Sequence, residues 1–166
     1  MTTGCEMPLP SQNFRPDMLV NNYKTTSYKN GNIEWILQAD KASYFYDEKR
    51  TIADKILLNY YKDDKETAVV EADRAIIYND SMDIDLIGNV DMTSTTGNRL
   101  LTEKIKWNNS KGYLDNDEYI IITRKNGDII EGDGLRADYN LETYEIKNNV
   151  KAVTSNINKG LEDKTK

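Results

Sequence analysis

The sequence predicts an all-β protein made of stacked β-hairpins, and three patterns support that prediction. The first is a repeat in which a small residue is followed, three positions later, by a second anchor residue. A fixed period of this size indicates one supersecondary unit that is stacked several times. The four copies begin 33, 30 and 30 residues apart, at Ala39/Ala42, Ala72/Ala75, Thr102/Ile105 and Gly132/Leu135.

The second pattern is alternation with a period of two residues, which is typical of strands. Residues 82–86 and 144–147 alternate apolar and charged side chains, and Ile33, Trp35 and Leu37 share one face. Because successive side chains of a strand point to opposite faces, the predicted sheet has one apolar and one polar face. The third pattern is a polar turn after each extended run, at residues 47–49, 79–81, 108–112 and 140–142.

The first 16 residues are predicted to form a flexible tether. Pro8, Pro10 and Pro16 lie among polar residues, and proline favours extended backbone that pairs with no neighbour. Cys5 follows Gly4 and precedes these prolines, an order typical of the start of a mature bacterial lipoprotein. We expect Cys5 to carry a lipid anchor, which needs two or three acyl chains to hold firmly to a membrane. The alternative is a free thiol.

The folded domain is expected to occupy residues 17–153. A first strand is predicted around residues 18–23, and Asn30-Gly31 signals a hairpin turn because both residues tolerate positive φ. The polar, lysine-rich residues 154–166 are expected to form a frayed tail. In each repeat a second strand follows the turn, and these second strands are predicted to end near Ile56, Val90, Ile120 and Val150.

The spacing of the repeat requires a bend within each unit. Two anchors three residues apart cannot share a face of a flat strand, because side chains alternate with a period of two. A bulge or a sheet corner between them restores the common face. We expect such corners at Asp73-Arg74, Glu103-Lys104 and Asp133-Gly134.

Composition excludes several classes of function. The net charge is −6 and no histidine is present. Nucleic acid is therefore an unsuitable partner, since its phosphates require a basic surface. Without histidine there is no Ser-His-Asp triad, and the usual general base near neutral pH is missing. A single cysteine permits no internal disulfide. We expect no enzymatic activity and no cofactor.

Two acidic groups are candidates for calcium binding or paired-acid chemistry, because carboxylates two residues apart share a strand face. Their spacing fits no calcium-loop motif. We therefore interpret them as solvated strand faces or turns and predict no metal site. The groups are Asp115, Asp117 and Glu118, and Asp83, Asp85 and Asp91.

Four segments resemble the LptC family of periplasmic lipopolysaccharide-export proteins. Residues 69–92 resemble the A-D-x-A … Y-x-G-x-V-x-V segment of that family, and residues 98–121 and 132–150 resemble its next and last repeats. Residues 31–60 resemble its opening strands. The export proteins LptA and LptD share the same repeat, so an LptA-like bridge protein is the nearest alternative.

The resemblance implies a twisted, V-shaped β-jellyroll that is open along one edge and performs no catalysis. Lipopolysaccharide acyl chains would lie in the groove between its two sheets. An inner-membrane ABC transporter complex would deliver the lipid, and edge-strand pairing would pass it to a bridge protein. Family members usually open with a transmembrane helix, and this sequence shows none. Either a lipidated Cys5 replaces the helix at the inner membrane, or the helix is missing from the sequence.

The side chains expected to contact lipid are those of the predicted apolar face. The residues alone leave open whether that face lines a groove or fills an ordinary core, as in a structural surface lipoprotein. A third alternative, a carbohydrate-binding module, requires exposed tryptophans. The expected lipid-binding residues are Trp35, Leu37, Tyr44, Ala75, Ile77, Ile84, Leu86, Val90, Trp107, Leu114, Leu135, Ile146 and Val150.

Overall fold

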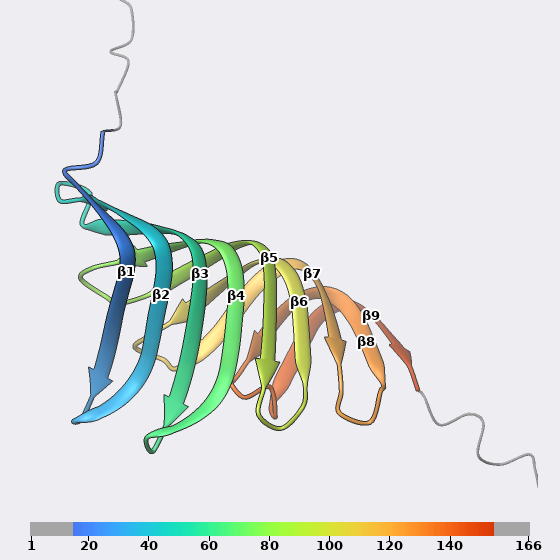
Figure 1. The fold of residues 1–166 in the computed structure, drawn as a ribbon. Helices are drawn as coiled ribbons and strands as arrows, with labels where there is room; N and C mark the ends of the chain where they lie inside the picture. Colours follow the sequence, from blue (N-terminus) through green and yellow to red (C-terminus); the bar gives the residue numbers. More distant parts are fainter. Residues whose placement is uncertain (1–14, 155–166) are drawn as a thin grey trace, which may run out of the picture.

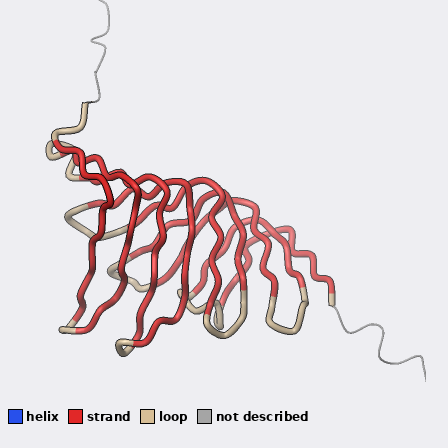
Figure 2. Tube along the Cα trace, viewed as in Figure 1, coloured by secondary structure: helices blue, strands red, loops and turns tan. Residues whose placement is uncertain are grey.

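The computed structural model describes residues 15–154, in which nine strands form one sheet. Each strand pairs antiparallel with its neighbour in the sequence, from β1 at one edge to β9 at the other. Residues 15–154 contain strands and loops only (Figure 2), so they hold no helix that could cross a membrane. The all-β prediction is confirmed. The strands are β1 (Met18–Lys29), β2 (Asn32–Phe45), β3 (Arg50–Lys62), β4 (Lys65–Tyr78), β5 (Ile84–Ser94), β6 (Arg99–Asn108), β7 (Tyr113–Thr123), β8 (Ile129–Ala137) and β9 (Tyr144–Val153).

The hairpin turns include those that the sequence predicts, at Asn30-Gly31 and within residues 46–49, 79–81, 109–112 and 139–143. Asn30 and Gly31, with φ of 52° and 84°, connect β1 to β2. Asp63 and Asp64 adopt φ of 52° and 58° between β3 and β4. Two successive residues with positive φ form a turn whose twist matches that of the flanking strands. These tight turns hold neighbouring strands in register.

Every strand bends part-way along its length, and the bends form a line across the sheet that we call the corner line (Figure 1). Left-handed backbone marks this line at Asn22, Lys55, Asn89, Gly134 and Asn149, with φ between 47° and 76°. Strand pairing is interrupted there, as in β4–β5 and β5–β6. Bulges of this kind redirect a strand and let a sheet fold over itself.

The corner line explains the three-residue spacing of the repeat. Ala39 and Ala42 are both buried, as are Ala72 and Ala75, because the strand turns between the two members of each pair. The pairing breaks include the predicted corner positions, Asp73 among them. The predicted strand ends are wrong, since they lie just beyond the corner and the strands continue. The observed ends are Lys62, Ser94, Thr123 and Val153.

The corner line divides the sheet into two layers with an apolar interior between them. The first layer carries the hairpin turns at residues 46–49, 79–83, 109–112 and 138–143, and the second carries those at 30–31, 63–64, 95–98 and 124–128. One contiguous cluster of buried side chains fills the interior. At the tips of the layers, Asn98 Nδ2 donates to the Leu141 carbonyl at 3.0 Å. The two layers therefore meet at the corner line and also at their tips.

Cys5 and nearly all of the predicted tether and tail lie outside the described residues. The nine strands span residues 18–153, within the range expected for the folded domain.

Candidate functional site

The interior between the two layers contains most of the side chains expected to contact lipid. Alternation in each strand turns these side chains inward, and the corner line keeps them inward on both halves of the strand. Their exposed fractions are at most 3%. The fully interior residues are Trp35, Leu37, Ala75, Ile77, Ile84, Leu86, Val90, Trp107, Leu114 and Leu135.

Three expected residues are not fully buried, although one of them, Ile146, packs against the interior cluster. Tyr44 and Ile146 are half-buried. Val150 is 56% exposed, so its placement on the dry face is wrong. The reason is that Val150 follows the left-handed Asn149 on β9, an edge strand whose residues from Asn148 to Val153 are all exposed. Sequence alternation continues there without an opposing layer to cover it.

The two tryptophans do not form an exposed aromatic platform. Trp35 is fully buried and Trp107 is 1% exposed. Flat carbohydrate-binding faces require aromatic rings open to solvent, so this arrangement argues against the carbohydrate-binding alternative. Both rings instead contribute to the apolar interior.

An aromatic cluster closes the interior where the tips of the layers meet. Tyr60 of β3 lies 5.1 Å from Trp107 of β6 and 5.9 Å from Tyr139, measured between ring centroids. Trp107 and Tyr139 meet edge to face at 5.8 Å. Ring pairs in these geometries add about 0.5–1.5 kcal/mol beyond the burial of apolar area. We call Trp35, Tyr60, Trp107 and Tyr139 the mouth cluster.

A pocket of about 240 Å³ opens beside the mouth cluster. Trp107 and Tyr139 form its inner wall. Hairpin-turn residues from both layers form its rim, including Asn30, Asp63 and Gly112. The pocket is smaller than the roughly 300–1,000 Å³ of sites that enclose a small molecule. It therefore fits a chemical group at the entrance to the interior, and not a whole glycolipid.

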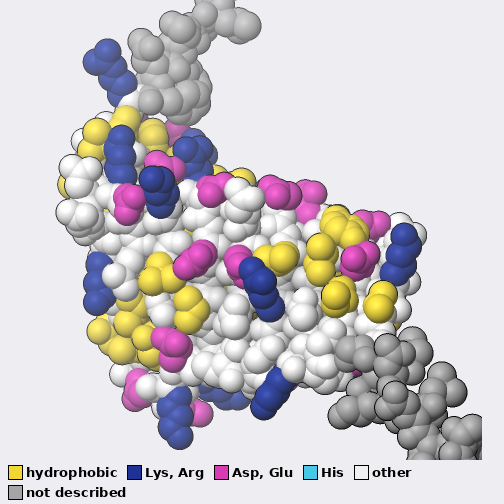
Figure 3. Space-filling view, turned by 45° about the vertical axis from the view of Figure 1, so that its right-hand side comes forward, with side chains coloured by type: hydrophobic (Ala, Val, Ile, Leu, Met, Phe, Trp, Pro, Cys, Tyr) yellow, Lys and Arg dark blue, Asp and Glu magenta, His cyan; other side chains and the backbone are white. Residues whose placement is uncertain are grey.

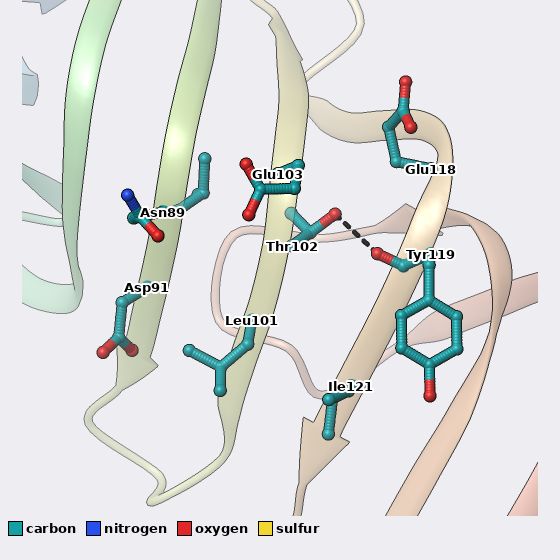
Figure 4. A pocket seen from close by; sticks show the side chains of 9 residues that line it. Asn89, Asp91, Leu101, Thr102, Glu103, Glu118, Tyr119 and Ile121 are labelled. Atoms are coloured by element: carbon teal, nitrogen blue, oxygen red, sulfur yellow. Dashed lines mark hydrogen bonds between the residues drawn. The ribbon is translucent and has the colours of Figure 1, made fainter.

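A second pocket, of about 480 Å³, lies on the outer face over β5, β6 and β7 (Figure 4). Leu101 and Ile121 line it and point outward, since their neighbours Leu100 and Ile122 are buried. Glu103 also lines it. Figure 4 shows the hydrogen bond from the Thr102 hydroxyl to the Tyr119 carbonyl, 2.9 Å long, that crosses the gap between β6 and β7. Three carboxylates line this second pocket, those of Asp91, Glu103 and Glu118, and it lies outside the apolar interior.

Four of the six acidic residues singled out in the sequence form ion pairs with basic side chains, namely Asp83, Asp91, Asp115 and Asp117. Lys147 Nζ lies 3.2 Å from Asp115 and 2.8 Å from Asp117, and these contacts raise the pKa of Lys147. Lys106 pairs with Asp83 at 3.6 Å. Within residues 15–154 no group of three or more His, Cys, Asp or Glu side chains is arranged to hold a metal ion. On the face in Figure 3, apolar patches are separated by charged side chains of both signs.

Sequence reasoning missed two members of the mouth cluster. Tyr60 continues the buried alternation of Ile56 and Leu58, so its position was available from the pattern. Tyr139 lies in the loop between β8 and β9. A loop residue follows no period, so only the folded chain places its ring against Tyr60 and Trp107.

Comparison with protein families identifies the group to which this sequence is related. The model of the family described as "Lipopolysaccharide-assembly, LptC-related" matches residues 4–155, which is most of the 166 residues. The chain belongs to this family. Membership in the LptC-related family makes it a protein of periplasmic lipopolysaccharide transport and confirms the resemblance seen in the repeats.

Solved structures include relatives of the LptC-related fold. LptH from Pseudomonas aeruginosa, described as the LptA homologous periplasmic component of the lipopolysaccharide transport device, matches with a TM-score of 0.55 and 9% sequence identity. The match covers 72% of this chain and 93% of LptH. At this identity the likeness shows the fold, an open β-jellyroll. Among curated proteins, no sequence matches.

Proposed function

We propose that this LptC-related protein binds the acyl chains of lipopolysaccharide between its two layers. It receives the lipid from an inner-membrane ABC transporter complex and passes it to an LptA-like bridge protein in the periplasm. The supporting observation is the apolar interior, which residues of β2 to β8 line from both layers of an open sheet. Hydrocarbon is the ligand chemistry that such an interior accepts.

Lipid entry requires the layers to part, because the interior side chains are packed against one another and buried. Each methylene group that leaves water contributes about 0.8 kcal/mol, so a dozen methylenes contribute ~10 kcal/mol. Whole domains are stable by about 5–15 kcal/mol. The free energy gained when one acyl chain is buried is therefore large enough to offset the cost of separating the tips of the layers without unfolding the sheet.

The two free edges of the sheet suit transfer between neighbouring jellyrolls. β1 and β9 each pair with one strand only, and an unpaired edge accepts a strand from another protein. A lipidated Cys5, which lies outside the described residues, would hold the β1 end at the inner membrane. We therefore assign β1 to the transporter side and β9 to the bridge protein.

The assignment of β9 predicts where the bridge protein can be crosslinked. A photoreactive residue at Val150, which is 56% exposed on β9, crosslinks to a purified LptA-like protein. The matched control is Tyr46, which is 57% exposed in the turn between β2 and β3 and does not crosslink. Crosslinking at both positions, or only at Tyr46, contradicts edge-to-edge transfer through β9.

Lipid binding in the interior is tested with two adjacent residues of β5. Leu86 is buried and its neighbour Ile87 points outward on the same strand. Photo-leucine, which has nearly the size of leucine, is placed at either position in the full chain and irradiated with lipopolysaccharide. Crosslinking at Leu86 and its absence at Ile87 supports the proposal. Labelling at Ile87 alone overturns it, provided that circular dichroism shows both variants to be folded.

The closed interior favours one other function, that of a structural surface lipoprotein with a permanently filled core. The complete burial of Trp35, Leu37 and Leu86 supports this alternative. The same experiment separates the two functions, because a filled core gives no lipid crosslink at Leu86. The second alternative is an LptA-like bridge protein, which would pair with other jellyrolls through both β1 and β9 and would carry no anchor. Pairing through β9 alone distinguishes an LptC-like protein from such a bridge.

A further inference from the structure

Three hydrogen-bond donors in the mouth cluster are buried without an acceptor. They are the indole nitrogens of Trp35 and Trp107 and the hydroxyl of Tyr60. An indole N–H can only donate, so each indole needs an acceptor from another molecule or another residue. A buried donor without a partner destabilises a protein, and native structures contain few of them.

The three donors lie close together across the two layers. Trp35 is the direct partner of Tyr60 in the β2–β3 ladder. Tyr60 packs against Trp107 from the opposite layer at 5.1 Å between ring centroids. Trp107 also lines the pocket of about 240 Å³ at the entrance to the interior. A ligand group that enters this pocket therefore meets Trp107 first, and the Tyr60 ring packs directly against Trp107.

The charges around the pocket indicate which acceptor fits. Lys29 and Lys62 line the rim, but so do Glu34 and Asp63. Lys29 is paired with Glu34 at 3.9 Å. Burial, and secondarily the negative charge of Glu34, raises the pKa of Tyr60, so its hydroxyl keeps its proton. A rim with balanced charge lacks the surplus of cations that a phosphate requires, and an uncharged oxygen is the better fit.

We propose that the mouth cluster is a subsite for the uncharged carbonyl oxygens at the root of an acyl chain. Such oxygens lie where the hydrocarbon begins, as the donors lie where the apolar interior begins. The lipid enters between the tips of the layers, its chain passes into the interior, and its ester or amide carbonyl accepts from Trp107, Tyr60 or Trp35. The subsite rests on the proposed function, because it positions the same lipid.

The subsite is tested with two amphiphiles of equal chain length. N-dodecanoyl glucosamine carries an amide carbonyl at the root of its chain, and dodecyl glucoside carries a glycosidic oxygen there and no carbonyl. Calorimetric titration of the full chain, below the critical micelle concentration of each probe, gives the affinities. The variants are Trp107→Phe and Tyr60→Phe, which keep a ring and remove the donor. Tyr28→Phe, at an exposed position of β1, is the matched control.

We expect wild type to bind the amide at least fivefold more tightly than the glucoside. One hydrogen bond contributes about 1 kcal/mol, which corresponds to about fivefold in affinity. Trp107→Phe and Tyr60→Phe each weaken amide binding about fivefold and leave glucoside binding unchanged, whereas Tyr28→Phe changes neither. Tyr60→Phe also raises the urea midpoint of the lipid-free protein, because it removes a buried hydroxyl without a partner.

The outcomes separate this inference from the function on which it rests. Equal affinity of wild type for the two probes, or equal losses for both probes in the variants, overturns the subsite. If lipopolysaccharide still crosslinks at Leu86 in that case, the proposed function stands without the subsite. If wild type binds neither probe and lipopolysaccharide does not crosslink at Leu86, the proposed function fails and the subsite fails with it.

Discussion

The side-chain amide of Asn116 donates to the hydroxyl of Thr102 across a gap in the β6–β7 ladder, at 3.0 Å. The same nitrogen donates to the Lys104 carbonyl at 2.8 Å. Backbone pairing is interrupted between Thr102 and Lys106, where the strands cross the corner line. Thr102 in turn donates to the Tyr119 carbonyl at 2.9 Å. Side chains thus replace the backbone hydrogen bonds that the bend removes, as buried polar groups require.

Replacement of Asn116 by alanine tests this repair of the ladder. We expect Asn116→Ala to lower the free energy of unfolding by about 1–3 kcal/mol, because the Lys104 carbonyl loses its buried donor. Urea unfolding measures the change. The control is Asn59→Ala, which removes an exposed hydrogen bond to Glu66 and is expected to change stability within about 0.5 kcal/mol. Equal effects at both positions contradict a structural role for Asn116.

Gly132 is predicted to be required for the attachment of β9. A Cβ at Gly132 would lie 2.5 Å from Ile146 Cγ2 and 2.9 Å from the Asn148 carbonyl oxygen, so β9 must move to make room. Gly31→Ala is the control, because its Cβ meets nothing within 4 Å and only its φ of 84° is unfavourable. In Gly132→Ala the backbone amides of β9 should exchange their hydrogens faster than in wild type. In Gly31→Ala only the amides near the β1–β2 turn should exchange faster. Unchanged β9 protection in Gly132→Ala refutes the close approach.

The ion pair of Arg99 with Asp91 predicts a stability difference that depends on pH. Arg99 Nε and a terminal nitrogen donate to the two Asp91 oxygens at 2.8 and 2.6 Å, which lowers the pKa of Asp91. A carboxyl whose pKa is lower in the folded than in the unfolded state stabilises the fold at pH values above the unfolded-state pKa of about 3.9. This stabilisation is lost as the pH falls through the folded-state pKa. Wild type should therefore have a slightly higher urea midpoint than Arg99→Met at pH 7, and an equal one at pH 2. High salt should reduce the difference at pH 7, since both side chains are partly exposed. A difference that persists at pH 2 has another cause.

The exposure of Val150 makes β9 tolerant of charge. Val150→Asp is expected to change the free energy of unfolding within about 0.5 kcal/mol, because the side chain is already in water. Ile122→Asp places a carboxylate in the interior at a fully buried position, and we expect loss of the folded state at room temperature. Circular dichroism and urea unfolding distinguish the two. Strong destabilisation by Val150→Asp would contradict the exposure of Val150 and indicate that its side chain is buried.

The sequence predicts the fold well where local chemistry decides the backbone. Asn30-Gly31 indicates a hairpin turn because both residues tolerate positive φ, and the turn is present. Lys55 adopts a φ of 53° at the corner line. Lysine has no local preference for positive φ, so the sequence does not predict this corner or the continuation of β3 to Lys62. Val150 fits the alternation of a buried strand, but its exposure depends on β9 being the last strand. Burial of interior residues such as Leu86 was predictable, whereas the approach of Tyr139 to Tyr60 depends on how the layers close.

Because the strands pair in the order in which they follow one another in the chain, the number of repeats sets the length of the sheet. Each strand pairs only with the strands before and after it in the chain, and each repeat of about thirty residues adds one hairpin that crosses the corner line in the same way. Insertion or deletion of one such unit would lengthen or shorten the interior by two strands without rethreading the chain. The length of the apolar interior in a single copy is thus set by the number of repeats, while its width is set by where every strand turns.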